Sequence, residues 1–327
     1  MLLKKYFFLL CDAVLKNEII IINKPQSVMQ AYQADALGPS FGLPNSGASC
    51  YFNTMVQSLL SCPVIRQTLE SIKGTQEFAN CQVARALLAM WETPQHSAQL
   101  CDIMRTCVLR YNKKFDHGQQ DVSEAFLTLL DILECLPKVY QLFQHRYQTL
   151  IYCTDCEAVV SKVDEHGTLF QIQPNLNAGQ SDKFAHIDPM YNKTQSLNDF
   201  LMKVNNSTDK DFKCPKCNRP GEKFKTTMLQ MVPEILPIVL KKYRSKSLTE
   251  FPEFLEFPSA SSGTKLIYQL VAQCEHSGTQ HGGHYWAVCR RNQWQTFNDM
   301  HVSPGNYGPQ PSTYMIWYCY VKTIPLN

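Results

Sequence analysis

The sequence predicts an α+β fold in which helices and strands occupy separate layers. Apolar residues recur at helical spacing through roughly the first 140 residues. Beyond them, short runs rich in β-branched and aromatic residues are separated by turn residues, which is typical of strands. Because the helices come first and the strands later, segregated layers are favoured over a parallel α/β sheet.

Between residues 50 and 137, four segments have the apolar spacing of amphipathic helices. In the first of them, a Gly-rich turn leads into Cys50, where the helical pattern begins, and Pro63 lies just past the expected end. The expected helices are 50–60, 83–91, 100–111 and a segment from near Asp121 to before Pro137.

The second part of the chain has the patterns of strands. The expected strands are 147–152, 167–173, 224–232, 235–243, 266–274, 285–290, 294–298 and 314–321. The stretch 174–211 is polar and rich in Asn, Asp and Ser, so we expect a long excursion with one short helix at 197–204.

The composition is that of a globular chain, and 327 residues leave room for one large core or two modest ones. A net charge of +3, without a stripe of basic and aromatic residues, disfavours nucleic-acid binding, including binding by a zinc ribbon. The 14 cysteines fall into two C-x-x-C pairs and scattered singles. This pattern favours a metal site in a reducing compartment, the cytoplasm or the nucleus, over a disulfide framework.

The N-terminal stretch has an apolar run after Lys4 and Lys5, but Asp12 interrupts it and no small-residue cleavage pattern follows. A secretory signal is therefore not expected, and no stretch has the length of a membrane span. Apolar spacing over 3–15 predicts an amphipathic helix that packs against the rest of the fold. Docking to a partner or to a membrane surface is the alternative for this helix.

Cys50 has the setting of a nucleophile. It would open a helix, where the helix dipole favours negative charge and lowers the pKa of a thiol. The alternative is a buried structural cysteine, since free cysteine is among the most buried residue types. This residue alone leaves both interpretations open.

A thiol nucleophile needs a base, a group that orients the base, and donors for the oxyanion. His284 is the best candidate base, because two glycines precede it and it begins a predicted strand. The return strand of a hairpin would bring Asn298 or Asp299 alongside it, and strand alternation lets only one of them face the imidazole. The candidate oxyanion donors are the backbone N–H of Cys50 and the side chain of Asn45, which is otherwise an ordinary turn residue.

Two C-x-x-C pairs, Cys153 with Cys156 and Cys214 with Cys217, supply four thiolates. If the pairs converge, they form a tetrahedral Cys₄ site of the kind that holds structural Zn²⁺. Convergence requires the chain between the pairs to fold out and back. Free thiols are the alternative, and a redox pair is disfavoured because neither pair lies in a βαβ pattern.

The motifs around these residues resemble those of the ubiquitin-specific protease family, the peptidase C19 deubiquitinases. The segment 45–53, with Gln57 after it, resembles the cysteine box of the family. The segment 283–285, continued by Trp294 and 297–299, resembles its histidine box.

Two further segments, 119–121 and 240–243, resemble the family's Gln-Gln-Asp segment and a strand of its palm. The matches follow the family's order over about residues 40 to 321. Ser49 stands where threonine is usual, and Lys242-Tyr243 stands where Arg-Phe is usual. No reactive group is lost by these departures, but they leave the choice between ubiquitin and a ubiquitin-like modifier open.

The resemblance implies a papain-like cysteine protease fold with a helical thumb, β-strand fingers that carry a zinc ribbon, and an antiparallel palm. The implied bounds are about 41–145 for the thumb, 146–235 for the fingers and 236–327 for the palm, with 1–40 as an N-terminal extension. The two cysteine pairs would lie at the tips of the fingers.

The resemblance also implies a role for each site residue. Cys50 matches the nucleophile, His284 the base and Asn298 the third member of the triad. Asn45 matches the oxyanion donor, and Asp299 is a helper that polarises the site.

The implied substrate is ubiquitin. Asp121 matches an acidic position that meets the basic C-terminal tail, where a carboxylate would form charge-assisted hydrogen bonds with an arginine. The other residues expected to bind substrate are Gln120, Gly283 and Tyr285. The implied activity is that of a thiol hydrolase acting after the C-terminal glycine of ubiquitin. The alternatives are the same chemistry on a ubiquitin-like modifier and a non-catalytic ubiquitin-binding module.

Overall fold

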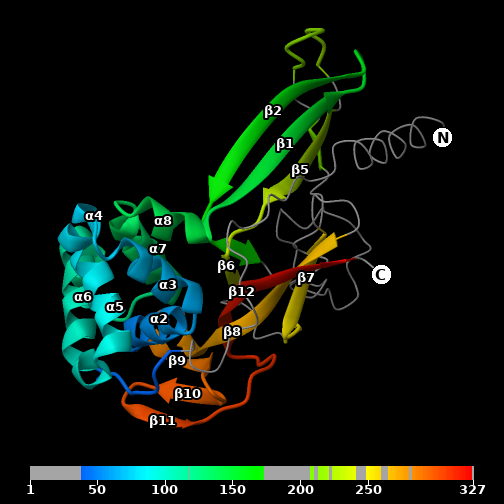
Figure 1. The fold of residues 1–327 in the computed structure, drawn as a ribbon. Coiled ribbons are helices and arrows are strands. Elements are labelled where there is room, and N and C mark those ends of the chain that lie inside the picture. The colour runs from blue at the N-terminus through cyan, green and yellow to red at the C-terminus, as the bar shows by residue number, and fades with distance from the viewer. Residues whose placement is uncertain are drawn as a thin grey trace.

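Figure 1 shows a bundle of helices beside a large sheet, with a second, narrow sheet that projects away from both. This computed structural model describes residues 38–116, 118–172, 207–209, 213–220, 223–240, 248–258, 264–279 and 282–325. The helices expected at 3–15 and 197–204 lie outside these residues, as does most of the excursion 174–211. Among the described residues, no helix is both long enough and apolar enough to cross a membrane.

The four expected helices are confirmed. The helical part consists of α2 (Cys50–Leu60), α3 (Pro63–Ile72), α4 (Gln76–Asn80), α5 (Gln82–Glu92), α6 (Ser97–Tyr111), α7 (Val122–Leu133) and α8 (Pro137–Tyr140), with the 3₁₀ turns η2 (Pro94–His96), η3 (Lys113–Asp116) and η4 (Gln141–Phe143). The sequence did not predict α3. Pro63, which marks the end of α2, is the first residue of α3, where its missing N–H costs no helical hydrogen bond.

The large sheet has the strand order β11-β10-β9-β8-β12-β6-β3, and β7 pairs with β8 outside this path. Its strands are β3 (Phe170–Ile172), β6 (Ile235–Leu240), β7 (Phe254–Pro258), β8 (Thr264–Thr279), β9 (Gly282–Arg290), β10 (Trp294–Asn298), β11 (His301–Pro304) and β12 (Thr313–Pro325). One pair departs from the expected antiparallel arrangement, because β3 and β6 run parallel. These two strands are joined through the narrow sheet, and such a long crossover permits parallel pairing.

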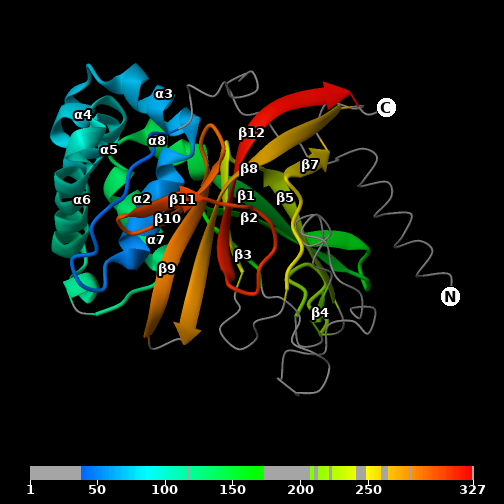
Figure 2. The ribbon, with the colours of Figure 1, turned by 90° about the horizontal axis from the view of Figure 1, so that it is seen from below.

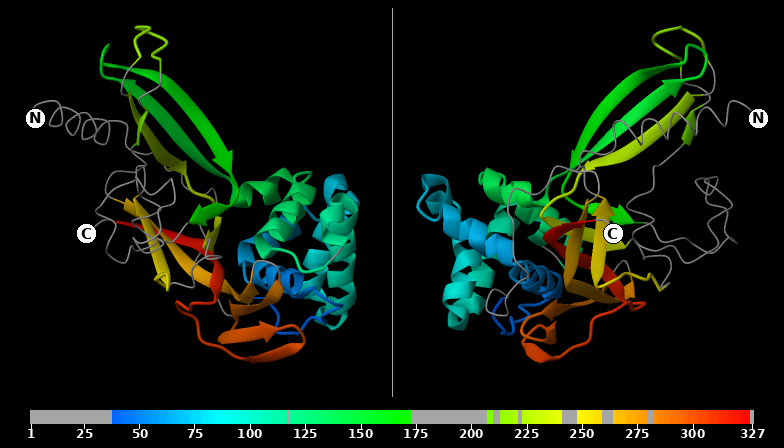
Figure 3. Two further views of the ribbon diagram at one scale, coloured as in Figure 1. Left: turned by 180° about the vertical axis from the view of Figure 1, so that it is seen from behind. Right: turned by 45° about the vertical axis from the view of Figure 1, so that its right-hand side comes forward.

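The narrow sheet has the order β2-β1-β5-β4. Its strands are β1 (His145–Cys153), β2 (Ala158–Gly167), β4 (Ser207–Asp209) and β5 (Lys223–Met231). Figure 3 shows from two sides that it extends away from the helices. The sequence did not predict β2, because its residues are exposed or half-buried throughout and no apolar alternation marks them. Backbone pairing with β1 along its full length makes it a strand.

β12 lies in the middle of the large sheet and is buried on both faces, which explains its nearly continuous apolar sequence. Its residues alternate between two clusters, Met315, Trp317 and Cys319 toward the helices and Ile316, Tyr318 and Tyr320 on the opposite face. Seen from below, the helices lie to one side of this sheet (Figure 2).

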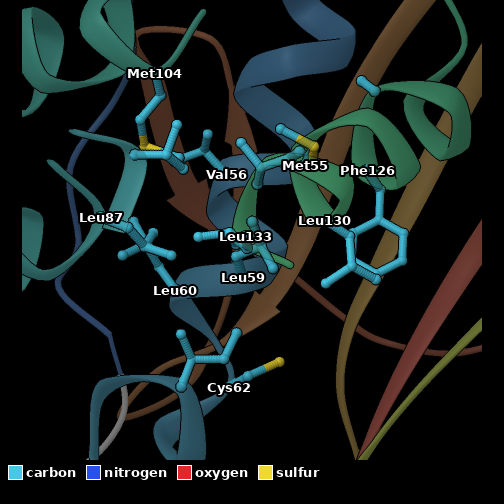
Figure 4. Close-up of a cluster of buried hydrophobic side chains, with 14 of the residues drawn as sticks. Met55, Val56, Leu59, Leu60, Cys62, Leu87, Met104, Phe126, Leu130 and Leu133 are labelled. Atoms are coloured by element: carbon cyan, nitrogen blue, oxygen red, sulfur yellow. The ribbon is translucent and has the colours of Figure 1, made fainter. Parts of the chain in front are cut away.

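α2 is the centre of the helical part, and all of its residues are buried. It contacts α3, α6 and α7 on one side and β8, β9 and β10 on the other. Figure 4 shows Met55, Val56 and Leu59 of α2 among side chains such as Met104 and Leu130 from neighbouring helices. Full burial of one such side chain stabilises the fold by about 1.5–3 kcal/mol. The helix that begins with Cys50 is therefore held from both sides.

Candidate active site

The thiol lies at the end of a tightly turned segment. Cys50 is the first residue of α2 and is 1% exposed. Before it, Gly47 and Ala48 both have positive φ, at 76° and 50°. Glycine adopts this conformation without steric cost, whereas alanine does so only when its surroundings hold it there. One such restraint is the side-chain oxygen of Asn45, which accepts a hydrogen bond from the Ser49 N–H at 3.1 Å.

The surroundings of the thiol keep it protonated. Burial raises the pKa of Cys50 most strongly, the Tyr285 backbone N–H lowers it by a hydrogen bond to the sulfur, and the Asp299 carboxylate raises it. The net pKa is raised, so the lowering expected from the helix N-terminus is outweighed. The thiol therefore needs a base. The bond from the Tyr285 N–H also places the sulfur against β9, at the residue that follows His284.

The expected base and its orienting group meet across a hairpin. His284 lies on β9 and Asn298 ends β10, and His284 Nε2 is 2.6 Å from Asn298 Oδ1. An amide oxygen only accepts hydrogen bonds, so Nε2 carries the hydrogen. Nδ1 is then the ring nitrogen that accepts a proton from a thiol. The structure thus decides which of the two adjacent candidates faces the imidazole, and it is Asn298.

The sequence allowed either Asn298 or Asp299 to face the imidazole, and Asp299 does not face it. It turns out of the strand with φ at 52°, and its carboxylate accepts hydrogen bonds from Asn45 Nδ2 at 2.9 Å and from Asn53 Nδ2 at 2.8 Å. Its backbone oxygen accepts from the Leu43 N–H at 3.0 Å. Asp299 therefore ties the turn before the thiol to the end of the histidine hairpin. Asn53 belongs to the cysteine-box segment, but its role was not predicted.

One N–H of the Asn45 side chain is not used by Asp299. The Asn45 Nδ2 carries two hydrogens, and the bond to Asp299 uses one of them. The second N–H and the backbone N–H of Cys50 are the two donors that the sequence predicts for an oxyanion. The oxyanion role of both groups stays a prediction.

Asp121 caps α7 and joins that helix to the large sheet. Its carboxylate accepts from the backbone N–H groups of Ser123 at 2.7 Å and Glu124 at 3.2 Å. The other oxygen accepts from the Tyr314 hydroxyl at 2.5 Å. The carboxylate that was expected to meet a basic tail is thus fixed in direction by its own helix and by β12.

A second bond joins the helical part to β9 near the base. Gln119 Oε1 accepts a hydrogen bond from the Gly283 N–H, one residue before His284. The sequence motif drew attention to the neighbouring Gln120, whose side chain donates to the Lys114 carbonyl at 2.9 Å. Gln119 lies in the same motif, but only the fold shows which glutamine reaches β9.

Tyr285 contributes its backbone to the thiol environment. Its ring is buried and lies against His276, with ring centroids 4.4 Å apart. The ring also contacts Tyr314 at 5.8 Å. Among the residues expected to bind substrate, Tyr285 is therefore the one whose side chain belongs to the core.

The two cysteine pairs converge as the sequence predicts. The sulfur atoms of Cys153, Cys156, Cys214 and Cys217 all lie within 4.8 Å of one another. Cys153 and Cys217 are 3.8 Å apart at sulfur, as are Cys156 and Cys214. In a tetrahedral site with Zn–S bonds of about 2.3 Å, the sulfurs are about 3.8 Å apart. The cluster lies at the end of the narrow sheet farthest from the helices (Figure 1).

A buried cation accompanies the cluster. Lys223 is 0% exposed, and its Nζ is 2.5 Å from Asp155 Oδ2. The ammonium also hydrogen-bonds to Cys153. Four thiolates around a divalent cation leave net negative charge, which a neighbouring ammonium offsets in part. The donor set and its surroundings therefore fit a zinc site.

Comparison with known families gives the relationship directly. Residues 41–318 match the family model described as ubiquitin carboxyl-terminal hydrolase. The chain belongs to this family. The resemblance carried by the cysteine-box and histidine-box segments is thereby confirmed.

The chain is distant in sequence from two members of the ubiquitin carboxyl-terminal hydrolase family. Ubiquitin carboxyl-terminal hydrolase 17-like protein A of Mus musculus is 24% identical over 298 residues, which cover 81% of this chain and 53% of that protein. Ubiquitin carboxyl-terminal hydrolase Usp2 of Drosophila melanogaster is 22% identical over 334 residues, covering 85% of this chain and 34% of that protein. The chain thus spans about half or less of the length of these relatives.

Solved structures confirm the fold. A chain of the SAGA DUB module Ubp8/Sgf11/Sus1/Sgf73 bound to monoubiquitin superimposes with a TM-score of 0.69 at 20% identity, covering 98% of this chain and 76% of that one. The same module bound to ubiquitin aldehyde gives a TM-score of 0.67 at 19% identity. The expected α+β fold of this family is therefore present.

Proposed function

We propose that the chain is a deubiquitinating thiol hydrolase that cleaves peptide and isopeptide bonds after the C-terminal glycine of ubiquitin. The observation that carries the proposal is the pair of His284 Nε2 and Asn298 Oδ1, 2.6 Å apart, beside a thiol at the start of a buried helix. Membership of the ubiquitin carboxyl-terminal hydrolase family supports this activity. Ubiquitin and ubiquitin aldehyde bound to the similar SAGA module support the substrate.

The first half of the reaction forms a thioester. His284 Nδ1 takes the proton from the Cys50 sulfur, and the thiolate attacks the carbonyl carbon of the ubiquitin C-terminal glycine. The Asn45 side chain and the Cys50 N–H donate to the oxyanion. The C–N bond then breaks as His284 returns the proton to the departing lysine amine.

The second half releases ubiquitin. His284 takes a proton from water, and the resulting hydroxide attacks the thioester carbon through a second oxyanion at the same donors. The C–S bond breaks, Cys50 regains a proton, and ubiquitin leaves with a free C-terminal carboxylate. Asn298 holds the imidazole in one tautomer and orientation through both halves.

The substrate tail is proposed to lie where the helical part meets β9. The bonds from Gly283 to Gln119 and from Tyr314 to Asp121 join the two parts at this place. An arginine of the tail would add a charge-assisted hydrogen bond to the Asp121 carboxylate. Gln120 and the backbone of Tyr285 complete the predicted binding residues.

Two other functions share this fold. The same chemistry acting on a ubiquitin-like modifier uses the same catalytic groups, so only the choice of substrate separates it from the proposal. A non-catalytic ubiquitin-binding module needs none of these groups, and the presence of thiol, imidazole and amide together disfavours it.

Labelling with ubiquitin that carries a C-terminal electrophile tests the proposal. We expect the probe to label the wild type and Cys135→Ala, whose substitution removes an exposed thiol, but not Cys50→Ala. Preferential labelling by a probe built on a ubiquitin-like modifier would show that this modifier, and not ubiquitin, is the substrate. Binding of ubiquitin to folded protein without labelling or turnover would assign the non-catalytic module instead.

We also propose that Cys153, Cys156, Cys214 and Cys217 hold one structural Zn²⁺. The sulfur separations and the buried Lys223 beside the cluster support this assignment. Four protein ligands fill a tetrahedral zinc, so the site is closed and supplies no Lewis-acid chemistry. Its contribution is to the folding of the narrow sheet.

The division into thumb (41–145), fingers (146–235) and palm (236–327) is proposed as well. The last turn of the helical part ends at Phe143 and β1 begins at His145, which supports the first boundary. A reducing compartment, cytoplasm or nucleus, is proposed because the cysteines of the described part form no disulfide.

A further inference from the structure

Trp286 lies beside the base, and neither the mechanism nor the family motifs use it. Residues 284 and 286 are two apart on β9, so their side chains leave the same face of the sheet. The His284 imidazole and the Trp286 indole are stacked, with ring centroids 6.2 Å apart and planes 21° apart. The indole is half-buried, so one part of it packs and another part faces solvent.

The hairpin register places Trp286 next to Asn298 as well. β9 and β10 pair Val288 with Thr296 and Ala287 with Phe297. The pairing ends there, and the same register extended by one position sets Trp286 opposite Asn298. Side chains at opposite positions of antiparallel strands lie about 4.5–5.5 Å apart at Cβ, so Trp286 adjoins both partners of the imidazole–amide hydrogen bond.

This hydrogen bond needs protection from water. Asn298 is exposed and His284 is half-buried, so the bond between them lies at the surface of the hairpin. A carboxylate in place of Asn298 would hold an imidazolium by charge, but an amide is neutral and holds it by the hydrogen bond alone. Water competes with such a bond wherever it reaches it, and competes less in a low-dielectric environment.

We propose that Trp286 is a positioning residue that covers one side of the His284–Asn298 hydrogen bond, reduces the access of water to it, and fixes the imidazole plane by stacking. The proposal rests on the thiol hydrolase function only for its kinetic consequences. The shielding itself is a property of the resting protein.

Kinetics with ubiquitin carrying a C-terminal fluorogenic amide test the consequence. We expect Trp286→Ala to lower kcat at least tenfold with KM changed less than twofold, and Trp286→Phe to recover most of the loss. The matched control is Tyr307→Ala, which removes an exposed aromatic ring that lies away from the base and packs on Trp294 of the same hairpin, with ring centroids 4.7 Å apart. We expect this control to keep kcat within twofold of the wild type.

A double substitution separates shielding from general disturbance of the hairpin. In an Asn298→Asp background, charge holds the imidazolium, so adding Trp286→Ala is expected to lower kcat less than threefold. An equal loss in both backgrounds would overturn the proposal. So would a loss in Tyr307→Ala as large as that in Trp286→Ala, or a loss that appears only in KM.

A measurement without turnover distinguishes this proposal from the proposed function. The Nε2–H proton of His284 is expected to exchange more slowly with water in the wild type and in Tyr307→Ala than in Trp286→Ala, as read by NMR of ¹⁵N-histidine-labelled protein. Equal exchange in wild type and Trp286→Ala overturns the shielding. Slow exchange in a wild type that no ubiquitin probe labels would leave the shielding supported and the hydrolase function refuted.

Discussion

At the scale of single residues, Asp299 connects the two halves of the site. One carboxylate binds Asn45 on one oxygen and Asn53 on the other, and these residues flank the turn that leads to Cys50. Asn45 is thereby held with its remaining N–H available for an oxyanion. Asp299 thus acts by positioning Asn45. It does not contact the imidazole, whose hydrogen-bond partner is Asn298.

Removal of this carboxylate is expected to slow the reaction. Loss of an oxyanion donor costs roughly 100- to 1000-fold in kcat, and Asp299→Ala leaves Asn45 present but unanchored, so we expect a loss of about 10-fold or more. Asp299→Asn keeps one acceptor oxygen and should lose less. Steady-state kinetics with a fluorogenic ubiquitin substrate measure both. Activity within twofold of wild type in Asp299→Ala would show that Asn45 needs no anchor.

The thiol should be poorly reactive without its base. Because burial and the Asp299 carboxylate raise the pKa of Cys50, its thiolate fraction at neutral pH is below that of a free cysteine, whose pKa is about 8.5. In His284→Ala, the rate of Cys50 alkylation by iodoacetamide is expected to rise with pH up to an apparent pKa above that value.

A second substitution checks the sign of this effect. Adding Asp299→Asn removes a charge that raises the pKa of Cys50, so the alkylation profile of His284→Ala should move to lower pH. A shift of the profile to higher pH would contradict the effect assigned to Asp299. An apparent pKa below that of free cysteine in His284→Ala alone would contradict the raised pKa of Cys50. Mass spectrometry of the modified peptide ensures that only alkylation of Cys50 is measured.

At the scale of elements, the narrow sheet begins at a buried histidine. Burial, with a smaller effect of nearby His166, lowers the pKa of His145 to about 4, and its ring packs on Phe170 with centroids 4.0 Å apart. Between about pH 6.5 and 4 the unfolded chain binds a proton that the folded protein does not. The free energy of unfolding therefore falls as the pH falls through this window, by up to roughly 3 kcal/mol.

His145→Phe should remove this acid sensitivity, because phenylalanine keeps an apolar ring beside Phe170 and binds no proton. Urea denaturation near pH 7 and near pH 5 is expected to show a smaller drop in the free energy of unfolding for this variant than for wild type. His166→Gln, at an exposed site on β2, removes only the smaller effect on His145 and should reduce the drop much less than His145→Phe does. An unchanged drop in His145→Phe would exclude His145 as its source.

The far end of the same sheet depends on metal in the proposal. Purified protein is expected to contain about one zinc per chain, and Cys214→Ser should lose it, with faster hydrogen exchange in β1, β2 and β5. Because α2 is packed elsewhere, alkylation of Cys50 should change little. Cys135→Ser is the matched control and should retain the metal. A metal-free wild type with fully protected strands would refute the structural role of zinc.

At the scale of the whole molecule, a buried cation joins the helical part to the large sheet. The Arg291 guanidinium is 3% exposed and donates to Ser61 Oγ at 2.5 Å, Gln57 Oε1 at 3.0 Å and the Pro39 carbonyl at 3.0 Å. It also lies 4.8 Å from the centroid of the Phe297 ring. These contacts span more than 200 positions in sequence and connect the end of α2 to the histidine hairpin.

Replacement of this arginine is expected to destabilise the protein strongly. Arg291→Ala leaves several buried acceptors without donors, each costing about 1–3 kcal/mol, so the free energy of unfolding should fall by roughly 3 kcal/mol or more. Arg291→Lys restores the charge but not the planar set of donors, and should recover only part of the loss. Chemical denaturation measures both variants. A loss below about 1 kcal/mol in Arg291→Ala would show that this connection is dispensable.

What could be predicted from the sequence is largely what depends on near neighbours along the chain. The start of α2 at Cys50 follows from a Gly-rich turn and an apolar period, and the pairing of His284 with Asn298 follows from a short hairpin. The family motifs extended these local patterns to an expected fold, which the comparisons confirm. The pattern of β2, by contrast, contains no alternation, so its strand structure depends on pairing with β1.

The sequence by itself determined the reactive groups, their local elements and the pairs of cysteines. Only the tertiary structure decided that Asp299 anchors Asn45, that Gln119 rather than Gln120 reaches Gly283, and that the Trp286 ring lies nearly parallel to that of His284. The physical reason is the separation along the chain of the residues that make each contact. Backbone periodicity and turns set contacts between residues a few positions apart, whereas contacts between distant segments exist only once both cores are packed.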